Sequence, residues 1–208
     1  MWLRRCFRRP YNRLRLPMKS YLDAVPILAA VAVYAVRIVE LRTRRQTIRG
    51  PIKENLTLKL FVLAGTLMFG GGLVEFIVRG WQWNWVTLAL GVASAVASFN
   101  LRRRAIAALG RFWSLHVEIR DNHEFVRSGP FRWMRHPTYF SMILELVAGA
   151  LIFEAWWTAV AVTGLFVPAL LLRLRLEESA LVEKFGPAYV EYQRSTPAVF
   201  PYRSPRNK

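Results

Sequence analysis

Long apolar runs alternate with short basic segments along the 208-residue chain. Three runs in the first half are each long enough to cross a bilayer as a helix, at about 21–41, 58–78 and 83–101. Two shorter runs follow at about 138–153 and 155–172, and their lengths suit a tilted or closely paired helical hairpin. The pattern predicts an all-α integral membrane protein with about five transmembrane helices.

Small residues in the predicted spans indicate where helices pack closely. Gly91, Ala95 and Ser98 recur at helical spacing in the third span, and Gly65 and Gly70–Gly72 lie in the second. Small side chains let the backbones of neighbouring membrane helices approach each other. We therefore expect a packing face on each of these helices.

Polar segments follow the third and the fifth apolar runs. Three consecutive arginines, Arg102–Arg104, are expected to end the third span, and a polar connector then extends to residue 137. The final segment, 173–208, is expected to be helical through about Tyr192 and irregular at its later prolines. These two segments hold the candidate motifs.

The composition narrows the class of protein. Hydrophobic residues make up 54% of the chain, and the formal net charge of +17 lies mainly between the apolar runs. Arginine-rich tracts also suit nucleic acid, but these flank apolar runs instead of lining an amphipathic helix, so we expect a lipid bilayer and no nucleic acid as partner. Cys6 is the only cysteine, which excludes an internal disulfide and a cysteine-rich metal site.

Basic residues also predict the orientation in the membrane. Five spans place the 42–57 loop, the 102–137 connector and the C-terminus on one face, which carries most of the Lys and Arg and is expected to be cytoplasmic. The basic tail at 1–20 then falls on the opposite face, against the rule. Met18 looks like an ordinary start, so residues 1–17 are a candidate non-native extension; the alternative is that the first two spans form a hairpin that does not fully cross the membrane. A bacterial inner membrane and a eukaryotic endomembrane are both compatible with the pattern.

A basic motif with two prolines precedes the fourth apolar run. The stretch Gly129–Tyr139 reads Gly-Pro-Phe-Arg-Trp-Met-Arg-His-Pro-Thr-Tyr. Because each proline disfavours helix at the residue before it, we expect an ordered connector that opens a helix near Thr138. The connector places Arg132, Arg135 and His136 near that helix's N-terminus, where free N–H groups and the dipole favour anions. The alternative is an ordinary basic loop beside the membrane.

A pair of adjacent glutamates, Glu177 and Glu178, follows the fifth apolar run. They come after Arg173 and Arg175 and before Phe185-Gly186-Pro187, Tyr189 and Tyr192. Neighbouring residues on a helix point about 100° apart, so the two carboxylates can contact different groups of one ligand. Carboxylates near the end of a membrane helix are costly unless they are paired or used. The alternative is an interfacial salt-bridge cluster with the two arginines.

Together the two motifs resemble the isoprenylcysteine carboxyl methyltransferase family and its relatives among the phospholipid methyltransferases. The resemblance covers about 109–201, and it is carried in order by Gly129–Arg132, Arg135–Tyr139, the apolar hairpin, the two glutamates, Phe185-Gly186, the two tyrosines and a late proline. One position departs from the family pattern, because Ser141 stands where the family usually has glycine. Its hydroxymethyl group either narrows a cofactor pocket or only packs against neighbouring residues.

The resemblance implies a methyltransferase that uses S-adenosylmethionine, leaves S-adenosylhomocysteine and methylates a lipophilic or prenylated acceptor, most directly the carboxylate of an isoprenylcysteine-like substrate. With the apolar pattern, the chain is expected to divide into a tail (1–20), three N-terminal spans (21–101) and a catalytic region (102–208) that holds the connector, the hairpin (138–172) and a C-terminal helix. The cofactor pocket is expected to face the cytoplasm. The residues implied to bind the cofactor are Arg135, His136, Pro137, Tyr139, Glu177 and Glu178.

The acceptor determines which further groups the chemistry needs. A carboxylate is already nucleophilic and needs a cation to position it, for which Arg173 is the first candidate and Arg132 the second. A phenol or hydroxyl would instead need a general base, and His136 is the candidate. No metal is expected, because His116 and His123 lack cysteine partners and metal-like spacing.

Two other classes of function stay open. A membrane reductase of the sterol-reductase type has a broadly similar C-terminal helical layout and uses NADPH. A non-enzymatic membrane scaffold would carry the same motifs as interfacial charge clusters. Stoichiometric binding of S-adenosylhomocysteine separates the methyltransferase from both, whereas NADPH binding favours the reductase. The acceptor and the oligomeric state are not predicted.

Overall fold

A computed structural model describes residues 21–42, 56–110 and 126–202 of the chain, and every regular element in these ranges is helical. The elements, in chain order, are η1 (Tyr21–Ala24), α1 (Val25–Arg42), α2 (Leu56–Val78), α3 (Trp85–Leu109), η3 (Gly129–Arg132), α4 (Pro137–Phe153), α5 (Trp156–Phe185) and α6 (Pro187–Ser195). The prediction of an all-α membrane protein is confirmed. The predicted basic tail, most of the 42–57 loop, and both His116 and His123 lie outside the described residues.

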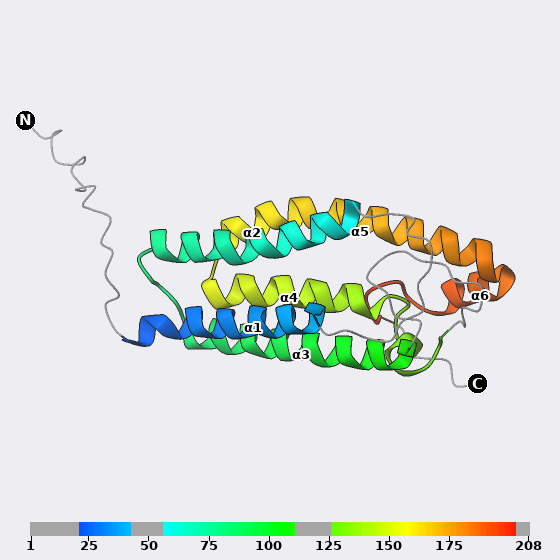
Figure 1. The fold of residues 1–208 in the computed structure, drawn as a ribbon, viewed down its shortest axis with the longest axis horizontal. Coiled ribbons are helices and arrows are strands. Elements are labelled where there is room, and N and C mark those ends of the chain that lie inside the picture. Colours follow the sequence, from blue (N-terminus) through cyan, green and yellow to red (C-terminus); the bar gives the residue numbers. More distant parts are fainter. Residues whose placement is uncertain (1–20, 43–55, 111–125, 203–208) are drawn as a thin grey trace, which may run out of the picture.

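The long helices form an elongated antiparallel bundle in which α4 occupies the centre (Figure 1). α2 and α5 lie together on one side of it, and α1 and α3 lie on the other. α1, α3 and α5 run toward the end that holds α6, and α2 and α4 run back. Because α4 contacts all four other long helices, its residues are shielded from the surroundings along most of its length.

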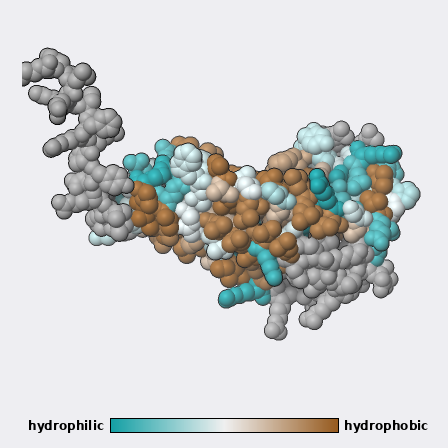
Figure 2. Space-filling view, turned by 90° about the horizontal axis from the view of Figure 1, so that it is seen from above, coloured by the Kyte–Doolittle hydropathy of each residue, from teal (hydrophilic) through white to brown (hydrophobic). Residues whose placement is uncertain are grey.

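Four of the described helices are long and apolar enough to cross a membrane: η1 with α1, α2, α3 and α5. α4 is apolar but shorter, with 17 residues. Many large apolar side chains on the outer helices are exposed, and Figure 2 shows a hydrophobic band over the middle of the molecule with hydrophilic residues gathered toward the end where α5 meets α6. A surface of this kind is stable in lipid and not in water.

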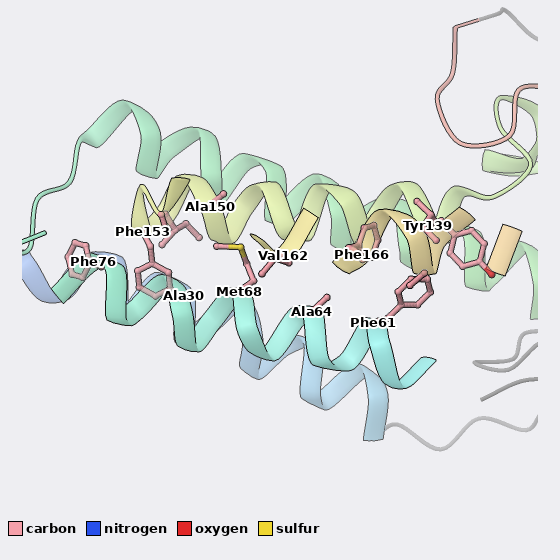
Figure 3. Close-up of a cluster of buried hydrophobic side chains, with 14 of the residues drawn as sticks. Ala30, Phe61, Ala64, Met68, Phe76, Tyr139, Ala150, Phe153, Val162 and Phe166 are labelled. Atoms are coloured by element: carbon pink, nitrogen blue, oxygen red, sulfur yellow. The ribbon is translucent and has the colours of Figure 1, made fainter. Parts of the chain in front are cut away.

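Aromatic and small side chains fill the space between α2, α4 and α5 (Figure 3). Phe76 and Phe153 are fully buried and their rings lie 5.9 Å apart. Toward the α6 end, the Phe61 ring lies 5.1 Å from Phe166 and 6.2 Å from Tyr139. The apolar core therefore extends without interruption to Tyr139, on the first turn of α4.

The predicted packing face of the third span is confirmed. Gly91 and Ser98 are buried against α4, where the Ser98 hydroxyl donates to the carbonyl of Ser141 at 2.6 Å. At Gly91 a Cβ atom would lie 2.8 Å from Ile152 Cγ1 and 3.1 Å from the Ala148 carbonyl oxygen. The α3 and α4 backbones can approach this closely only because position 91 has no side chain.

Replacing Gly91 with alanine is expected to destabilise the protein by about 1–3 kcal/mol, since the new methyl group collides with backbone atoms that cannot rotate away. Gly164 is the matched control, because open space surrounds its Cβ position on α5. Gly164→Ala should be neutral or slightly stabilising, as alanine is the better helix former. Thermal unfolding of both variants in one detergent measures the difference, and equal melting temperatures would contradict the close α3–α4 contact.

One predicted boundary is wrong, and one predicted helical segment contains a break. The three arginines do not end the third span, because α3 continues to Leu109 and buries Arg102 among polar partners on α1 and α4. The final segment is helical through Tyr192, as expected, but it is divided into two helices, since α5 ends at Phe185 and α6 begins at Pro187. Gly186 separates them with a φ of +55°, a conformation that glycine adopts without strain.

At the end of the bundle remote from α6, Glu75 caps the start of α5. Its carboxylate accepts hydrogen bonds from the backbone N–H groups of Trp157 at 3.2 Å and Thr158 at 2.8 Å. The Thr158 hydroxyl donates to the same carboxylate. A carboxylate at a helix N-terminus satisfies donors that have no partner within the helix and interacts favourably with the dipole.

Candidate functional site

The candidate site lies where the connector, the first turn of α4 and the last third of α5 meet. Arg135 and His136 precede α4, and their backbone N–H groups donate to the carbonyls of Pro197 and Ala198, each at 2.9 Å. The segment after α6 therefore holds the connector in an extended course. Pro137 is fully buried as the first residue of α4, where its missing N–H costs nothing.

Glu178 on α5 is the centre of the polar part of the site. Its Oε1 lies 2.6 Å from Nη2 of Arg135 and 2.9 Å from Nε2 of His136, and its Oε2 accepts from the side-chain amide of Gln193 at 3.1 Å. Three side chains, two from the connector and one from α6, thus converge on one carboxylate. Charge-assisted hydrogen bonds of this kind are about twice as strong as neutral ones, so Glu178 is held in a defined position.

A second hydrogen-bonded chain runs from Arg173 through Tyr139 to Glu177. The Nε of Arg173 donates to the Tyr139 hydroxyl at 2.9 Å, and that hydroxyl donates to Oε2 of Glu177. The Arg173 Nη1 donates to the Thr57 hydroxyl on α2 at 3.1 Å. Tyr139 therefore links a buried cation to a carboxylate that keeps a third of its side-chain surface exposed.

The Arg173 guanidinium lies in apolar surroundings. Only 5% of the residue is exposed, and the guanidinium carbon is 5.8 Å from the centre of the Phe61 ring and 6.0 Å from that of Tyr139. The Tyr139 ring in turn stacks on His136, with ring centres 5.4 Å apart. A cation against aromatic faces is attracted electrostatically, and removal from water strengthens its interaction with an anion.

The position of these groups along α5 sets their depth in a membrane. At 1.5 Å per residue, Arg173 lies about 25 Å and Glu177 about 32 Å from the start of the helix at Trp156. The hydrocarbon core of a bilayer is about 30 Å thick. The guanidinium therefore lies just within the hydrocarbon layer, on the side remote from Trp156. The two glutamates lie at the boundary between this layer and the polar region.

α6 and the residues after it support the connector. The Arg135 Nη1 donates to the carbonyls of Gln193 at 2.9 Å and Thr196 at 2.5 Å. The Tyr192 hydroxyl donates to the Phe131 carbonyl at 2.5 Å, and burial raises the pKa of Tyr192 above its ordinary value, so the donor stays protonated. The sequence motifs included Tyr192, but nothing in their spacing indicated the role of Gln193 or Thr196.

Tyr192→Phe is expected to lower stability by about 1–2 kcal/mol, because it leaves the buried carbonyl of Phe131 without its donor. Tyr202→Phe is the matched control, since Tyr202 is 71% exposed. The melting temperatures of the two variants in the same detergent report the difference. Identical values would show that the Tyr192 hydroxyl does not hold the connector.

The structure brings together most of the side chains that the sequence nominated. Among the described residues, hydrogen bonds or ion pairs join Arg135, His136, Tyr139, Arg173, Glu177 and Glu178. Arg132 is not part of this group, because it is exposed on η3 and no hydrogen bond or ion pair within the described ranges joins it to the others. Ser141 faces α3 instead, where Arg102 Nε donates to its hydroxyl at 3.1 Å. Of the two readings of Ser141, packing is therefore the one that the structure supports.

Comparisons with known proteins point to one family. Residues 88–183 match the model of the isoprenylcysteine carboxyl methyltransferase (ICMT) family. The cobalt-zinc-cadmium resistance protein CzcN of Cupriavidus metallidurans is 34% identical over 149 residues, which are 68% of this chain and 59% of CzcN. The uncharacterized protein YpbQ of Bacillus subtilis is 33% identical over 95 residues, 45% of this chain and 56% of YpbQ.

Plant enzymes of the family are also similar. Protein-S-isoprenylcysteine O-methyltransferase B of Arabidopsis thaliana is 27% identical over 145 residues, which cover 69% of this chain and 73% of that protein. The chain spans less than two thirds of CzcN and of YpbQ. The matched region contains the connector, α4 and the glutamates of α5. Residues 88–183 are therefore similar to the isoprenylcysteine carboxyl methyltransferase family.

Proposed function

We propose that the protein is a membrane methyltransferase that transfers the methyl group of S-adenosylmethionine to the carboxylate of a lipophilic acceptor of the isoprenylcysteine type. One observation carries the proposal: a buried cation at the end of the apolar core, Arg173, is linked through Tyr139 to Glu177, one of two adjacent, partly exposed glutamates. A lipid-borne anion and a polar cofactor would meet at this junction. The plant relatives that are named isoprenylcysteine O-methyltransferases support the reaction class.

The residues present suit the polar groups of the cofactor. S-adenosylmethionine offers an ammonium group and two ribose hydroxyls as donors, and Glu177 and Glu178 are acceptors with lone pairs to spare after the hydrogen bonds described above. Arg135 supplies a positive charge for the carboxylate of the cofactor. Glu177 and Glu178 would hold the donor groups, and Arg135 with His136 would keep Glu178 in place.

When bound, the cofactor supplies an electrophilic methyl group, which forms a bond to the acceptor oxygen as its bond to sulfur breaks and leaves S-adenosylhomocysteine. The chain's own contribution is alignment and the exclusion of water. Arg173 would hold the acceptor carboxylate, because its guanidinium can present two parallel donors to two oxygens. Phe61 and Phe166 keep the surroundings of this cation apolar.

The geometry favours a carboxylate over a phenol as acceptor. A phenol needs a general base, and the only histidine of the described residues, His136, is 3% exposed with its Nε2 bonded to Glu178. Its Nδ1 lies 3.7 Å from Glu177. Both ring nitrogens thus face carboxylates of the site, whereas a carboxylate acceptor requires no base.

The proposed orientation places the site on the cytoplasmic side. α1 ends and α2 begins toward the end of the bundle where α5 meets α6, so both ends of the basic 42–57 loop lie on that side. Short loops rich in Lys and Arg stay in the cytoplasm. Glu177 lies nearer the C-terminal end of α5 than Arg173 does. The cofactor would therefore enter from the cytoplasm, and the acceptor would enter from the bilayer.

The direct test is methyl transfer in a defined membrane. The purified protein in phospholipid nanodiscs receives S-adenosylmethionine labelled in its methyl group, together with a farnesylated cysteine acid, its ready-made methyl ester, or a long-chain phenol. We expect base-labile label, released as methanol, with the acid alone. Label in the phenol only would replace the proposed acceptor class, and no transfer to any of the three by folded protein would contradict the proposal.

A further inference from the structure

A second group of charged side chains lies on the face of α4 opposite Tyr139. We call it the Arg102 cluster; it consists of Arg37 and Glu40 from α1, Arg102 from α3 and Glu145 from α4. Residues two positions apart on a helix point about 200° apart, so Ser141, which touches this cluster, faces away from Tyr139. The same short helix therefore carries the candidate site on one side and a buried ionic network on the other.

Arg102 uses its whole guanidinium within this cluster. It is 5% exposed; Nη1 bonds to Glu40 at 2.7 Å, and Nη2 bonds to Glu145 and to the Ser98 hydroxyl. Its Nε donates to the Ser141 hydroxyl at 3.1 Å. One side chain thereby ties α1, α3 and α4 together.

The contact with Ser141 reaches the candidate site through the backbone. The Ser141 hydroxyl donates to the carbonyl of Thr138 at 2.6 Å, and its own carbonyl accepts from Ser98. Thr138 lies in the first turn of α4, directly before Tyr139 and two residues after His136. The network thus fixes the turn from which the two site residues project.

This network lies within membrane helices, where burying charged side chains costs free energy. Charged groups within membrane helices are retained where they are paired and used. Arg37 makes only long contacts, at 3.5 Å to Glu40 and 3.6 Å to Glu145, and Oε1 of Glu40 is buried without a hydrogen-bond partner in the described part of the chain. Within the Arg102 cluster, the short ion pairs are those that Arg102 forms, so Arg102 is its central residue.

We propose that Arg102 is a positioning residue for the methyltransferase site, which fixes the first turn of α4 so that His136 and Tyr139 stay aligned with the glutamates of α5. This role rests on the proposed function. Glu40 extends the functional unit to α1, which lies before the region that matches the family. The role differs from general stabilisation because it acts on the affinity of the site.

The test compares affinity with stability in four variants of the full-length protein. Arg102→Lys and Ser141→Ala disturb the network, and Arg104→Lys changes an exposed arginine of the same helix. Glu75→Gln weakens the cap of α5, about 30 Å from the glutamates, and so lowers stability without touching the site. Each protein is titrated with S-adenosylhomocysteine by calorimetry at least 15 °C below its melting temperature.

We expect affinity to fall about tenfold in Arg102→Lys and about threefold in Ser141→Ala, the range typical of residues that act through a packed network. Arg104→Lys should match the unaltered protein, and Glu75→Gln should lose melting temperature but no affinity. Unchanged affinity in both network variants would overturn the positioning role and leave the proposed function intact. If Arg102→Lys does not fold, Ser141→Ala alone decides. No binding by the unaltered protein would contradict the proposed function, and this role with it.

Discussion

Glu178→Gln abolishes most binding of S-adenosylhomocysteine, with an expected loss of affinity of about a hundredfold. The carboxylate is the shared acceptor of Arg135, His136 and Gln193, and the substitution replaces one of its oxygens with an amide that donates. The site then loses both an acceptor for the cofactor and the anchor of the connector. Because the other helices do not depend on this residue, the protein should stay folded.

Calorimetric titration of both proteins, with circular dichroism to verify folding, measures this effect. The control is Glu183→Gln, the same change at an exposed position farther along α5. We expect the control to bind as the unaltered protein does. Equal affinity in Glu178→Gln and Glu183→Gln would remove Glu178 from the binding site.

Arg173→Lys is expected to lower kcat by about a hundredfold to a thousandfold, while the affinity for S-adenosylhomocysteine changes by less than about threefold. A lysine keeps the charge but cannot donate in parallel to two carboxylate oxygens or replace the Nε contact to Tyr139. Arg173 reaches Glu177 through the Tyr139 hydroxyl, while Glu178 keeps its own bonds to Arg135 and His136, so most cofactor binding should survive.

Steady-state kinetics with a prenylated cysteine acid, beside the calorimetric affinity, separate these two effects. Arg175→Lys is the matched control, because Arg175 is exposed two residues farther along the same helix. If Arg173→Lys loses cofactor affinity in proportion to kcat, the residue holds the cofactor and does not position the acceptor.

The sequence predicted the fold well where the physical signal was local. Runs of apolar residues longer than a bilayer is thick have few alternatives to a membrane helix, and the helices follow these runs. Small residues at helical spacing indicated the α3 face that contacts α4, and at Gly91 a Cβ atom would collide with α4. Both signals depend on residues near one another in the chain.

The errors arose where distant residues decide the structure. Three arginines in a row indicate the end of a span, but Arg102 finds carboxylates on α1 and α4, and these offset the cost of burying it. The side of α4 that Ser141 faces likewise depended on the partner helix. Periodicity within one helix contains no information about such partners.

The candidate site likewise has one part that the sequence predicted and another part that it did not. The two motifs supplied Arg135, His136, Tyr139, Glu177 and Glu178, all of which the structure brings together. It leaves Arg132 outside the group, because η3 turns that side chain outward. The segment after α6, which holds the connector through backbone carbonyls, had no side-chain signal that a sequence could show.

A calorimetric titration of the detergent-purified protein with S-adenosylhomocysteine, with NADPH as a parallel ligand, distinguishes a methyltransferase from a reductase. We expect saturable binding of S-adenosylhomocysteine, near one molecule per chain, and no binding of NADPH. Binding of NADPH alone would favour a membrane reductase. No binding of either ligand to folded protein would contradict the methyltransferase and reduce the family match to a shared fold.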